Sequence, residues 1–204
     1  METDERELDA IIVQNIGDLE ASMNRTKKRI DARLNEEAWK VLKHALGEED
    51  WHFEEFGDFD NWFAPRNWLT ADDAGDDDAD PWFRFGPLDT PRELGTWTGR
   101  YLSAKNNRQK MAFIFCWHRF YVDDYKAAAS EAAEDLKQIN HLGFHQDGRD
   151  IYLPLSFETN LMADGFRDND LRAALEPIVR AVTVLKATKK HFDALRLAML
   201  KHAR

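Results

Sequence analysis

Cysteine is nearly absent from this chain of 204 residues, because Cys116 is the only one. A single cysteine cannot form an internal disulfide, and this excludes disulfide-stapled folds and metal or redox sites built from several cysteines. No run of eighteen apolar residues occurs, so the sequence predicts no membrane-spanning helix. The first ten residues, METDERELDA, are charged where a secretory signal would be apolar, and we therefore expect a cytoplasmic protein.

Familiar catalytic motifs are lacking as well. The chain has no Walker, Rossmann, HExxH or Gly-x-Ser-x-Gly pattern, and no Glu-x-Lys follows its acidic clusters as in metal-dependent nucleases. The sequence therefore defines no enzyme class. Catalysis is left open, and a non-catalytic protein without a cofactor is the favoured interpretation.

What the chain has in excess is negative charge, and this charge is confined to one segment. The formal net charge is −10, but the segment from Glu48 to Glu93 alone holds fifteen acidic residues and three arginines, a balance of −12. This segment and its edge also contain five of the seven tryptophans: Trp51, Trp62, Trp68, Trp82 and Trp97. An acidic, aromatic segment favours a basic protein partner, and the total charge argues against nucleic acid.

Both ends of the chain show the apolar period of amphipathic helices. The first stripe predicts a long helix that ends at Gly47, and the second predicts a C-terminal helix with a kink or break near Pro177. The stripes are Leu8, Ile12, Ile16, Leu19, Met23, Ile30, Leu34, Ala38 and Val41, and Leu171, Leu175, Ile178, Val182, Leu185, Phe192, Leu195 and Met199. The two helices pair as an antiparallel helical hairpin, pack on a sheet as ordinary core helices, or form a coiled-coil homodimer; the sequence leaves these three arrangements open.

Between the helices the pattern changes to short aromatic and β-branched runs separated by turn residues, which predicts strands. The predicted strands are residues 51–56, 61–69, 82–85, 96–103, 109–117, 142–146 and 150–157. Residues 105–108 and the pair Asp147-Gly148 predict hairpins, Pro154 is placed at an edge or bulge, and a helix is expected from Asp123 to about Ile139.

The predicted fold is therefore α+β: a mostly antiparallel sheet of about five to seven strands with one packed helix, inserted between long terminal helices. Its parts are an N-terminal helix (residues 1–47), an acidic, tryptophan-rich core (48–165) and a C-terminal helix (166–204). We expect these parts to form one folded unit.

Cys116 and His118 stand at the end of the apolar run MAFIFCWH. Residues two apart on one strand face are about 7 Å from each other, too far for a thiol and an imidazole to share a hydrogen bond. Because both faces of this strand are apolar, it is predicted to be central, and Cys116 is predicted to be an inert, buried thiol. His118 lies at the strand end and is kept as a catalytic candidate, together with His52 and Glu54.

Two acidic clusters offer ligands for a divalent metal or a surface for a partner. The cluster around residues 52–60 supplies the candidate metal ligands His52, Glu55, Asp58 and Asp60. The aspartate-rich stretch after Thr70 fits no calcium-loop spacing and is expected to be a self-repelling surface loop. The candidate binding residues are Trp62, Trp68, Trp82, Asp72, Asp73, Asp76, Asp77 and Asp78.

Three functions follow from these patterns. The first is a protein-interaction module whose acidic aromatic surface binds a basic protein, one form of which is an inhibitor that mimics nucleic acid. The second is a metal-dependent hydrolase or nuclease that uses the cluster from His52 to Asp60. The third is a structural homo-oligomer that assembles through the helical stripes.

Overall fold

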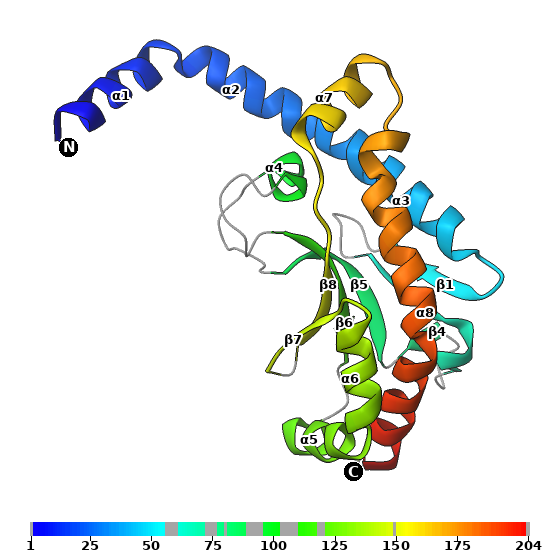
Figure 1. Ribbon diagram of the computed structural model, residues 1–204. Helices are drawn as coiled ribbons and strands as arrows, with labels where there is room; N and C mark the ends of the chain where they lie inside the picture. The colour runs from blue at the N-terminus through cyan, green and yellow to red at the C-terminus, as the bar shows by residue number, and fades with distance from the viewer. Residues whose placement is uncertain are drawn as a thin grey trace.

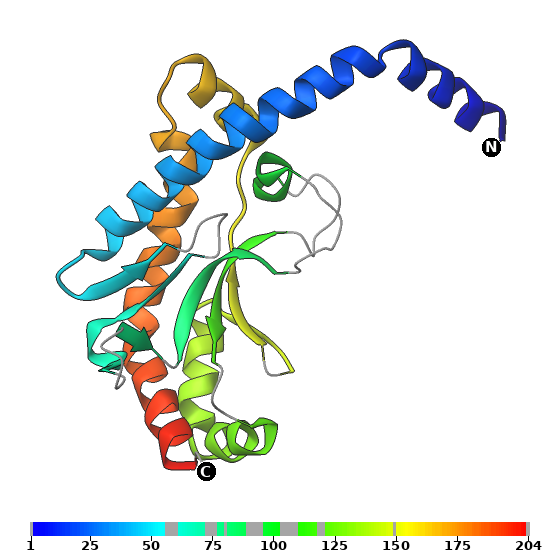
Figure 2. The ribbon, with the colours of Figure 1, turned by 180° about the vertical axis from the view of Figure 1, so that it is seen from behind.

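A six-stranded antiparallel sheet with helices on one of its faces forms the body of the protein (Figures 1 and 2). The computed structural model describes residues 2–55, 61–71, 77–79, 81–88, 96–102, 110–117, 121–148 and 150–202. The α+β class and the two long terminal helical segments predicted from the sequence are confirmed. None of the described helices combines the length and the apolarity that crossing a membrane requires.

The elements follow one another in an order that the sequence only partly anticipates. The helices are α1 (Glu2–Gln14), α2 (Ile16–Arg25), the π-helix η1 (Thr26–Ile30), α3 (Asp31–Leu46), the 3₁₀ turn η2 (Arg66–Trp68), α4 (Trp97–Tyr101), α5 (Val122–Glu131), α6 (Ala133–His141), α7 (Thr159–Arg167) and α8 (Arg172–His202). The strands are β1 (Trp51–Glu54), β2 (Trp62–Pro65), β3 (Leu69–Ala71), β4 (Asp77–Ala79), β5 (Trp82–Pro87), β6 (Met111–Cys116), β7 (His145–Asp147) and β8 (Asp150–Pro154).

The strand order of the main sheet is β1-β2-β5-β6-β8-β7, with β3 and β4 paired separately. Strand β6 lies between β5 and β8, and its residues Met111 to Phe115 are all buried. The prediction of a central strand from two apolar faces is thereby confirmed. The hairpin at Asp147-Gly148 is also confirmed, because Asp147 pairs with Asp150 and Gly148 takes a positive φ of 61°. Pro154 lies beyond the last pair of β7 with β8, where its missing N–H interrupts no ladder on that side.

One predicted strand is wrong and another, residues 61–69, is interrupted, because the 3₁₀ turn η2 separates β2 from β3. Residues 96–103 were expected to alternate as a strand, but Trp97 to Tyr101 form helix α4. The Thr96 side chain accepts a hydrogen bond from the Gly99 N–H at 3.0 Å and so caps this helix. The predicted hairpin that joins residues 96–103 to β6 is wrong for the same reason, since β6 pairs with β5 and β8.

Aromatic side chains on one face of the sheet pack against the long helices. Phe192 of α8 lies 5.0 Å from Phe83 and 5.1 Å from Phe115 between ring centroids, and Trp39 of α3 lies 6.4 Å from Phe63. Phe192 and Phe63 are fully buried. Burial of such rings contributes most of the stabilising free energy of a core of this kind.

Helices α3 and α8 pack side by side, and both descend in the view of Figure 1, so they run parallel to each other. Lys186 Nζ, in the middle of α8, donates to the Ala45 carbonyl near the end of α3 at 2.7 Å. The alternative of an antiparallel hairpin is therefore wrong: α7 returns the chain to the end of the molecule where α3 begins. Helix α8 continues from Arg172 to His202 with Pro177 inside it, so of the predicted kink or break the break does not occur.

Helices α1 and α2 project from the body as an arm, which we define as residues 2–25 (Figures 1 and 2). Helix α2 has no buried residue, whereas α3 buries six. At the root of the arm, buried Asp31 accepts hydrogen bonds from the Trp97 and Thr98 N–H groups at 2.9 and 2.8 Å. This carboxylate joins α3 to the start of α4.

Candidate functional site

The sheet face opposite the helices carries a straight row of side chains that crosses all six strands. Each member is the direct antiparallel partner of the next, so all project to the same face. The row is Glu54, Trp62, Arg84, Ile114, Tyr152 and His145. Five interstrand spacings of about 4.8 Å make it about 24 Å long. We call these six residues the cross-sheet row.

Alternation along the strands separates this face from the core. In β5, Phe83 and Phe85 point to the helices and are buried, while Trp82 and Arg84 point to the other face and are half-buried. In Figure 1 the helices α3, α6 and α8 lie on one side of the sheet, and Figure 2 shows the sheet from its other side. The cross-sheet row therefore lies on the face that these helices leave uncovered, where Ile114 in the middle of the row is nevertheless only 7% exposed.

Small residues flank the row on the same face. His52 pairs with Ala64, and Gly86 pairs with Ala112. Gly86 has room for a side chain, because its nearest neighbour would be the Arg84 guanidinium at 3.6 Å. The larger side chains of the row therefore stand above a floor of small ones, and Trp62, Arg84 and Tyr152 stay partly exposed.

Neighbours hold several of these side chains in place. His52 Nε2 lies 3.1 Å from Glu54 Oε1, and the His52 ring lies 5.3 Å from the Trp62 ring between centroids. At the other end of the row, His145 stacks on Tyr152 with centroids 5.6 Å apart and an interplanar angle of 18°. Side chains ordered in this way lose little further rotamer freedom when a partner binds.

The candidate metal ligands His52 and Glu55 point to different sides of the chain. Glu55 accepts hydrogen bonds from Trp39 Nε1 and Lys43 Nζ, both on α3, whereas His52 and Glu54 contact each other on the uncovered face. The hydrogen bond from Lys43 is the main cause that lowers the pKa of Glu55. The remaining candidates, Asp58 and Asp60, lie outside the described residues. Among the residues that are described, no group of three His, Cys, Asp or Glu side chains could hold a metal ion.

Trp68 does not belong to a binding surface, and this prediction is corrected. Its side chain is 1% exposed, stacks on Phe83, and donates from Nε1 to Asp193 Oδ1 at 2.6 Å. The 3₁₀ turn η2 directs the indole into the core beside α8. By contrast, Trp62 and Trp82 are half-buried on the uncovered face, and their binding role stays a prediction.

The other sequence candidates are only partly placed. Cys116 is half-buried, and its Sγ lies 3.6 Å from the Ile114 carbonyl oxygen. His118, Asp72, Asp73 and Asp76 lie outside the described residues. Asp77 and Asp78 are in strand β4, but their side chains are not described. The acidic surface predicted from the sequence therefore stays a prediction.

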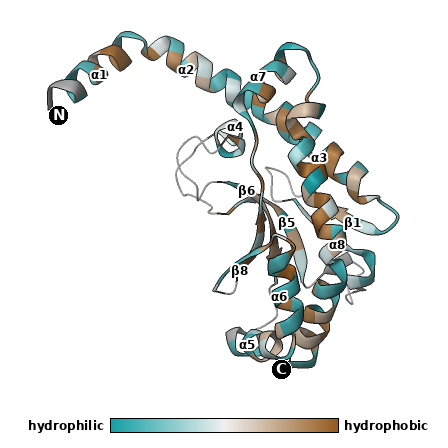
Figure 3. Cartoon of the chain, viewed as in Figure 1, coloured by the Kyte–Doolittle hydropathy of each residue, from teal (hydrophilic) through white to brown (hydrophobic). Residues whose placement is uncertain are grey.

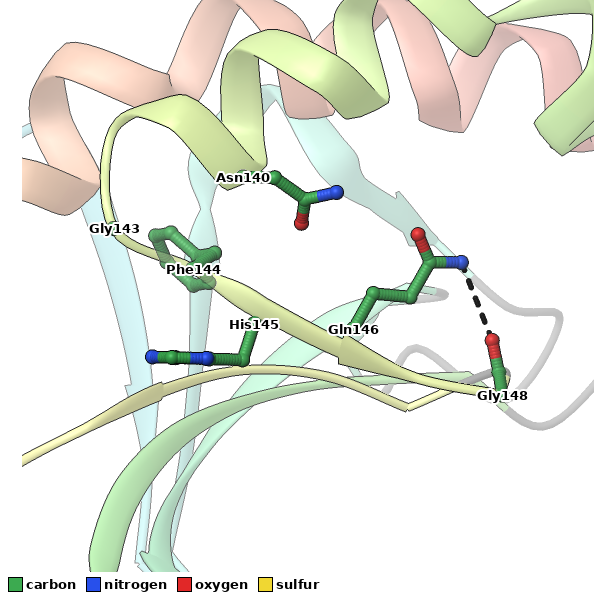
Figure 4. Close-up of a pocket in the computed structure, with 6 residues that line it drawn as sticks. All are labelled: Asn140, Gly143, Phe144, His145, Gln146 and Gly148. Carbon is green, nitrogen blue, oxygen red and sulfur yellow. Dashed lines mark hydrogen bonds between the residues drawn. The ribbon is translucent and has the colours of Figure 1, made fainter.

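A hollow of about 600 Å³ lies between the end of α6 and β7 (Figure 4). Gln146 Nε2 donates to the Gly148 carbonyl at 3.2 Å within it. Figure 4 shows His145 on the side of β7 away from Asn140 and Gln146, toward the uncovered face. The residues that line the hollow are Asn140, Gly143, Phe144, His145, Gln146 and Gly148. They bring no nucleophile next to a base, so the hollow offers no catalytic arrangement.

Sequence reasoning missed Arg84, Tyr152 and His145 as members of the site. They come from three strands that are far apart in the chain, and only the pairing register aligns them. The alternation of side chains in β5 and β8 could have shown which residues share one face of the sheet. It could not have shown which strands are neighbours or which residues pair across them. No family model, curated protein or solved structure matches this chain.

Proposed function

We propose that the protein is an interaction module whose uncovered sheet face binds a basic surface of another protein. The observation that carries this proposal is the cross-sheet row. It combines Trp62, Arg84 and Tyr152, the three residue types most enriched in binding hot spots. A row of about 24 Å has the width of a standard protein interface.

The carboxylates around the row support a basic partner, although the row itself contains the basic side chain of Arg84. Glu54 lies at one end of the row and is 36% exposed. Exposed Glu48, Glu49 and Asp50 precede β1, and the whole segment from Glu48 to Glu93 has a balance of −12. Opposite charge across an interface accelerates association and selects the partner, while the aromatic side chains contribute buried area.

The test uses a lysine- and arginine-rich peptide of about twenty residues as the probe, with affinity measured by isothermal titration calorimetry. We expect binding at about 0.05 M salt that weakens steeply at about 0.5 M. Trp62→Ala and Tyr152→Ala should each weaken the affinity roughly tenfold, because each removes a large aromatic contact from the row.

Leu197→Ala is the matched control, since Leu197 is 63% exposed on α8, away from the sheet face. It should leave the affinity unchanged. Circular dichroism of each variant checks that the fold is intact. Absence of binding at low salt would contradict a basic partner. Equal losses of affinity in the control and in the two sheet-face variants would contradict the sheet face as the binding surface.

The metal-dependent hydrolase is less well supported. It requires His52 and Glu55 to act together, but these side chains contact different groups on opposite sides of β1. The homodimer depends on a separate surface, the arm.

A further inference from the structure

The arm exposes apolar side chains that no described part of the same chain covers. Figure 3 shows a hydrophobic band on α1 with no other element beside it. The large exposed side chains, with exposed fractions from 39% to 71%, are Leu8, Ile11, Ile12, Val13, Ile16, Leu19 and Met23. A contiguous apolar surface of this kind on a soluble protein marks a docking site.

The arm also lacks the contacts that normally stabilise a helix. Helices α1 and α2 together are about 36 Å long. No residue of α2 is buried, and Gly17, near the junction of the two helices, has open space around it. Most helical stability in proteins comes from packing of the apolar stripe, and glycine in a helix lowers it further. The stripe is therefore built to pack on a partner.

Charge along the arm identifies that partner. Residues 5–20 hold five acidic side chains and one arginine, whereas residues 25–29 hold four basic side chains and no acidic one. Arg25, Lys27, Lys28 and Arg29 are all exposed. The acidic outer part of one arm thus complements the basic root of an identical arm, provided that the two run in opposite directions.

We propose that the arms of two copies of this chain pair as an antiparallel coiled coil. In the sequence the apolar positions Ile12, Ile16, Leu19 and Met23 follow one another in steps of three and four. The pairing requires α1 and α2 to align across Asn15, where the structure ends α1 and begins α2. Placing Ile16 opposite Leu19 of the second copy also places Ile12 opposite Met23, so the same stripe is buried on both helices. This register brings residues 5–9, with Glu5, Glu7 and Asp9, alongside residues 26–30 of the other copy.

A parallel pair is disfavoured by the same charges. It would place Lys27, Lys28 and Arg29 beside their own copies, and Glu5 and Glu7 beside theirs. Like charges at neighbouring positions destabilise paired helices. The antiparallel pair places the two bodies at opposite ends of the coiled coil and uses no residue of the cross-sheet row, so this inference is independent of the proposed binding function.

The first experiment measures the mass of the full chain by sedimentation equilibrium over a range of concentrations. We expect a dimer whose dissociation constant rises by on the order of a hundredfold in Leu19→Asp, because a charge would be buried in the seam. Leu197→Asp is the matched control: it places the same charge at an exposed leucine of the body and should leave the dimer intact. A chain that is monomeric at every concentration overturns the proposal.

Charge reversal tests the complementarity. The triple variant Glu5→Lys, Glu7→Lys, Asp9→Lys should weaken the dimer at least tenfold at low salt and less at high salt, because basic residues would then face the basic root. All three positions are exposed, so the body should keep its stability. An unchanged dissociation constant at low salt overturns the pairing of acidic and basic segments.

Disulfide trapping tests the direction and the register. In a Cys116→Ser background, Ile12→Cys chains and Met23→Cys chains are oxidised separately and as a mixture. The antiparallel register predicts a cross-linked dimer only in the mixture, since Ile12 faces Met23. Cross-linking of either variant with itself indicates a parallel pair and overturns the proposal.

Discussion

The N-terminal arm and helix α8 carry apolar stripes of similar spacing, yet only α8 buries its stripe within the chain. Helix α8 buries eleven of its 31 residues, and α2 buries none. The spacing of a stripe thus predicts a helix with one apolar face, but not the surface that this face contacts. In α8 the surface is made by the aromatic side of the sheet together with helices α3, α5 and α6. For the arm no described part of the chain supplies one.

The largest difference between the two helices should appear when each loses one apolar side chain. Phe192→Ala should lower the free energy of unfolding by about 3–5 kcal/mol, because Phe192 is fully buried and contacts Phe83, Phe115 and Phe144. Leu19→Ala in the arm should change it by less than about 0.5 kcal/mol in the monomer. Urea unfolding followed by circular dichroism at low protein concentration gives both values. Similar losses in the two variants would contradict the comparison.

An intermediate effect is expected at the junction of the arm and the body. Asp31→Ala leaves the Trp97 and Thr98 N–H groups without their acceptor and should cost about 2–3 kcal/mol of unfolding free energy. Asp31→Asn keeps one acceptor oxygen and should cost less. The same urea experiment measures both, with Asp18→Ala on the exposed arm as the control that should change little. A loss in Asp18→Ala equal to that in Asp31→Ala would show that the arm is packed.

The smallest effect concerns the start of α8. Asp170 accepts hydrogen bonds from the Arg172 side chain and backbone, which lower the pKa of its carboxyl to about 2. Since this pKa is depressed from 3.8, the stabilisation is present above about pH 4 and is lost as the pH falls through about 2. An NMR titration of the Asp170 carboxyl gives the midpoint directly. Arg172→Ala should move it back toward 3.8, and Arg180→Ala should not move it.

The sequence predicted the helices and strands that depend on neighbouring residues in the chain. Two apolar faces identified β6 as central, and Asp147-Gly148 identified a hairpin. At residues 96–103 the aromatic alternation suggested a strand, but the Thr96 cap and the distant carboxylate of Asp31 stabilise a helix instead. That second contact spans more than sixty residues and has no local signal.

The candidate site depends still more on distant pairing. Trp62 and Trp82 could be selected by residue type, but Trp68 was selected for the same reason and is buried by η2 and Asp193. To predict the cross-sheet row from the sequence, the register of all five strand pairs would have to be known. A shift of one residue in any of them would move its side chains to the helix side.

Strand β7 has three residues, His145, Gln146 and Asp147, and all of them are exposed and polar. A strand this short and hydrophilic at the rim of a sheet is a poor template for another chain, because it offers few backbone groups and no apolar strip. The sheet is therefore protected from edge-to-edge pairing at this rim.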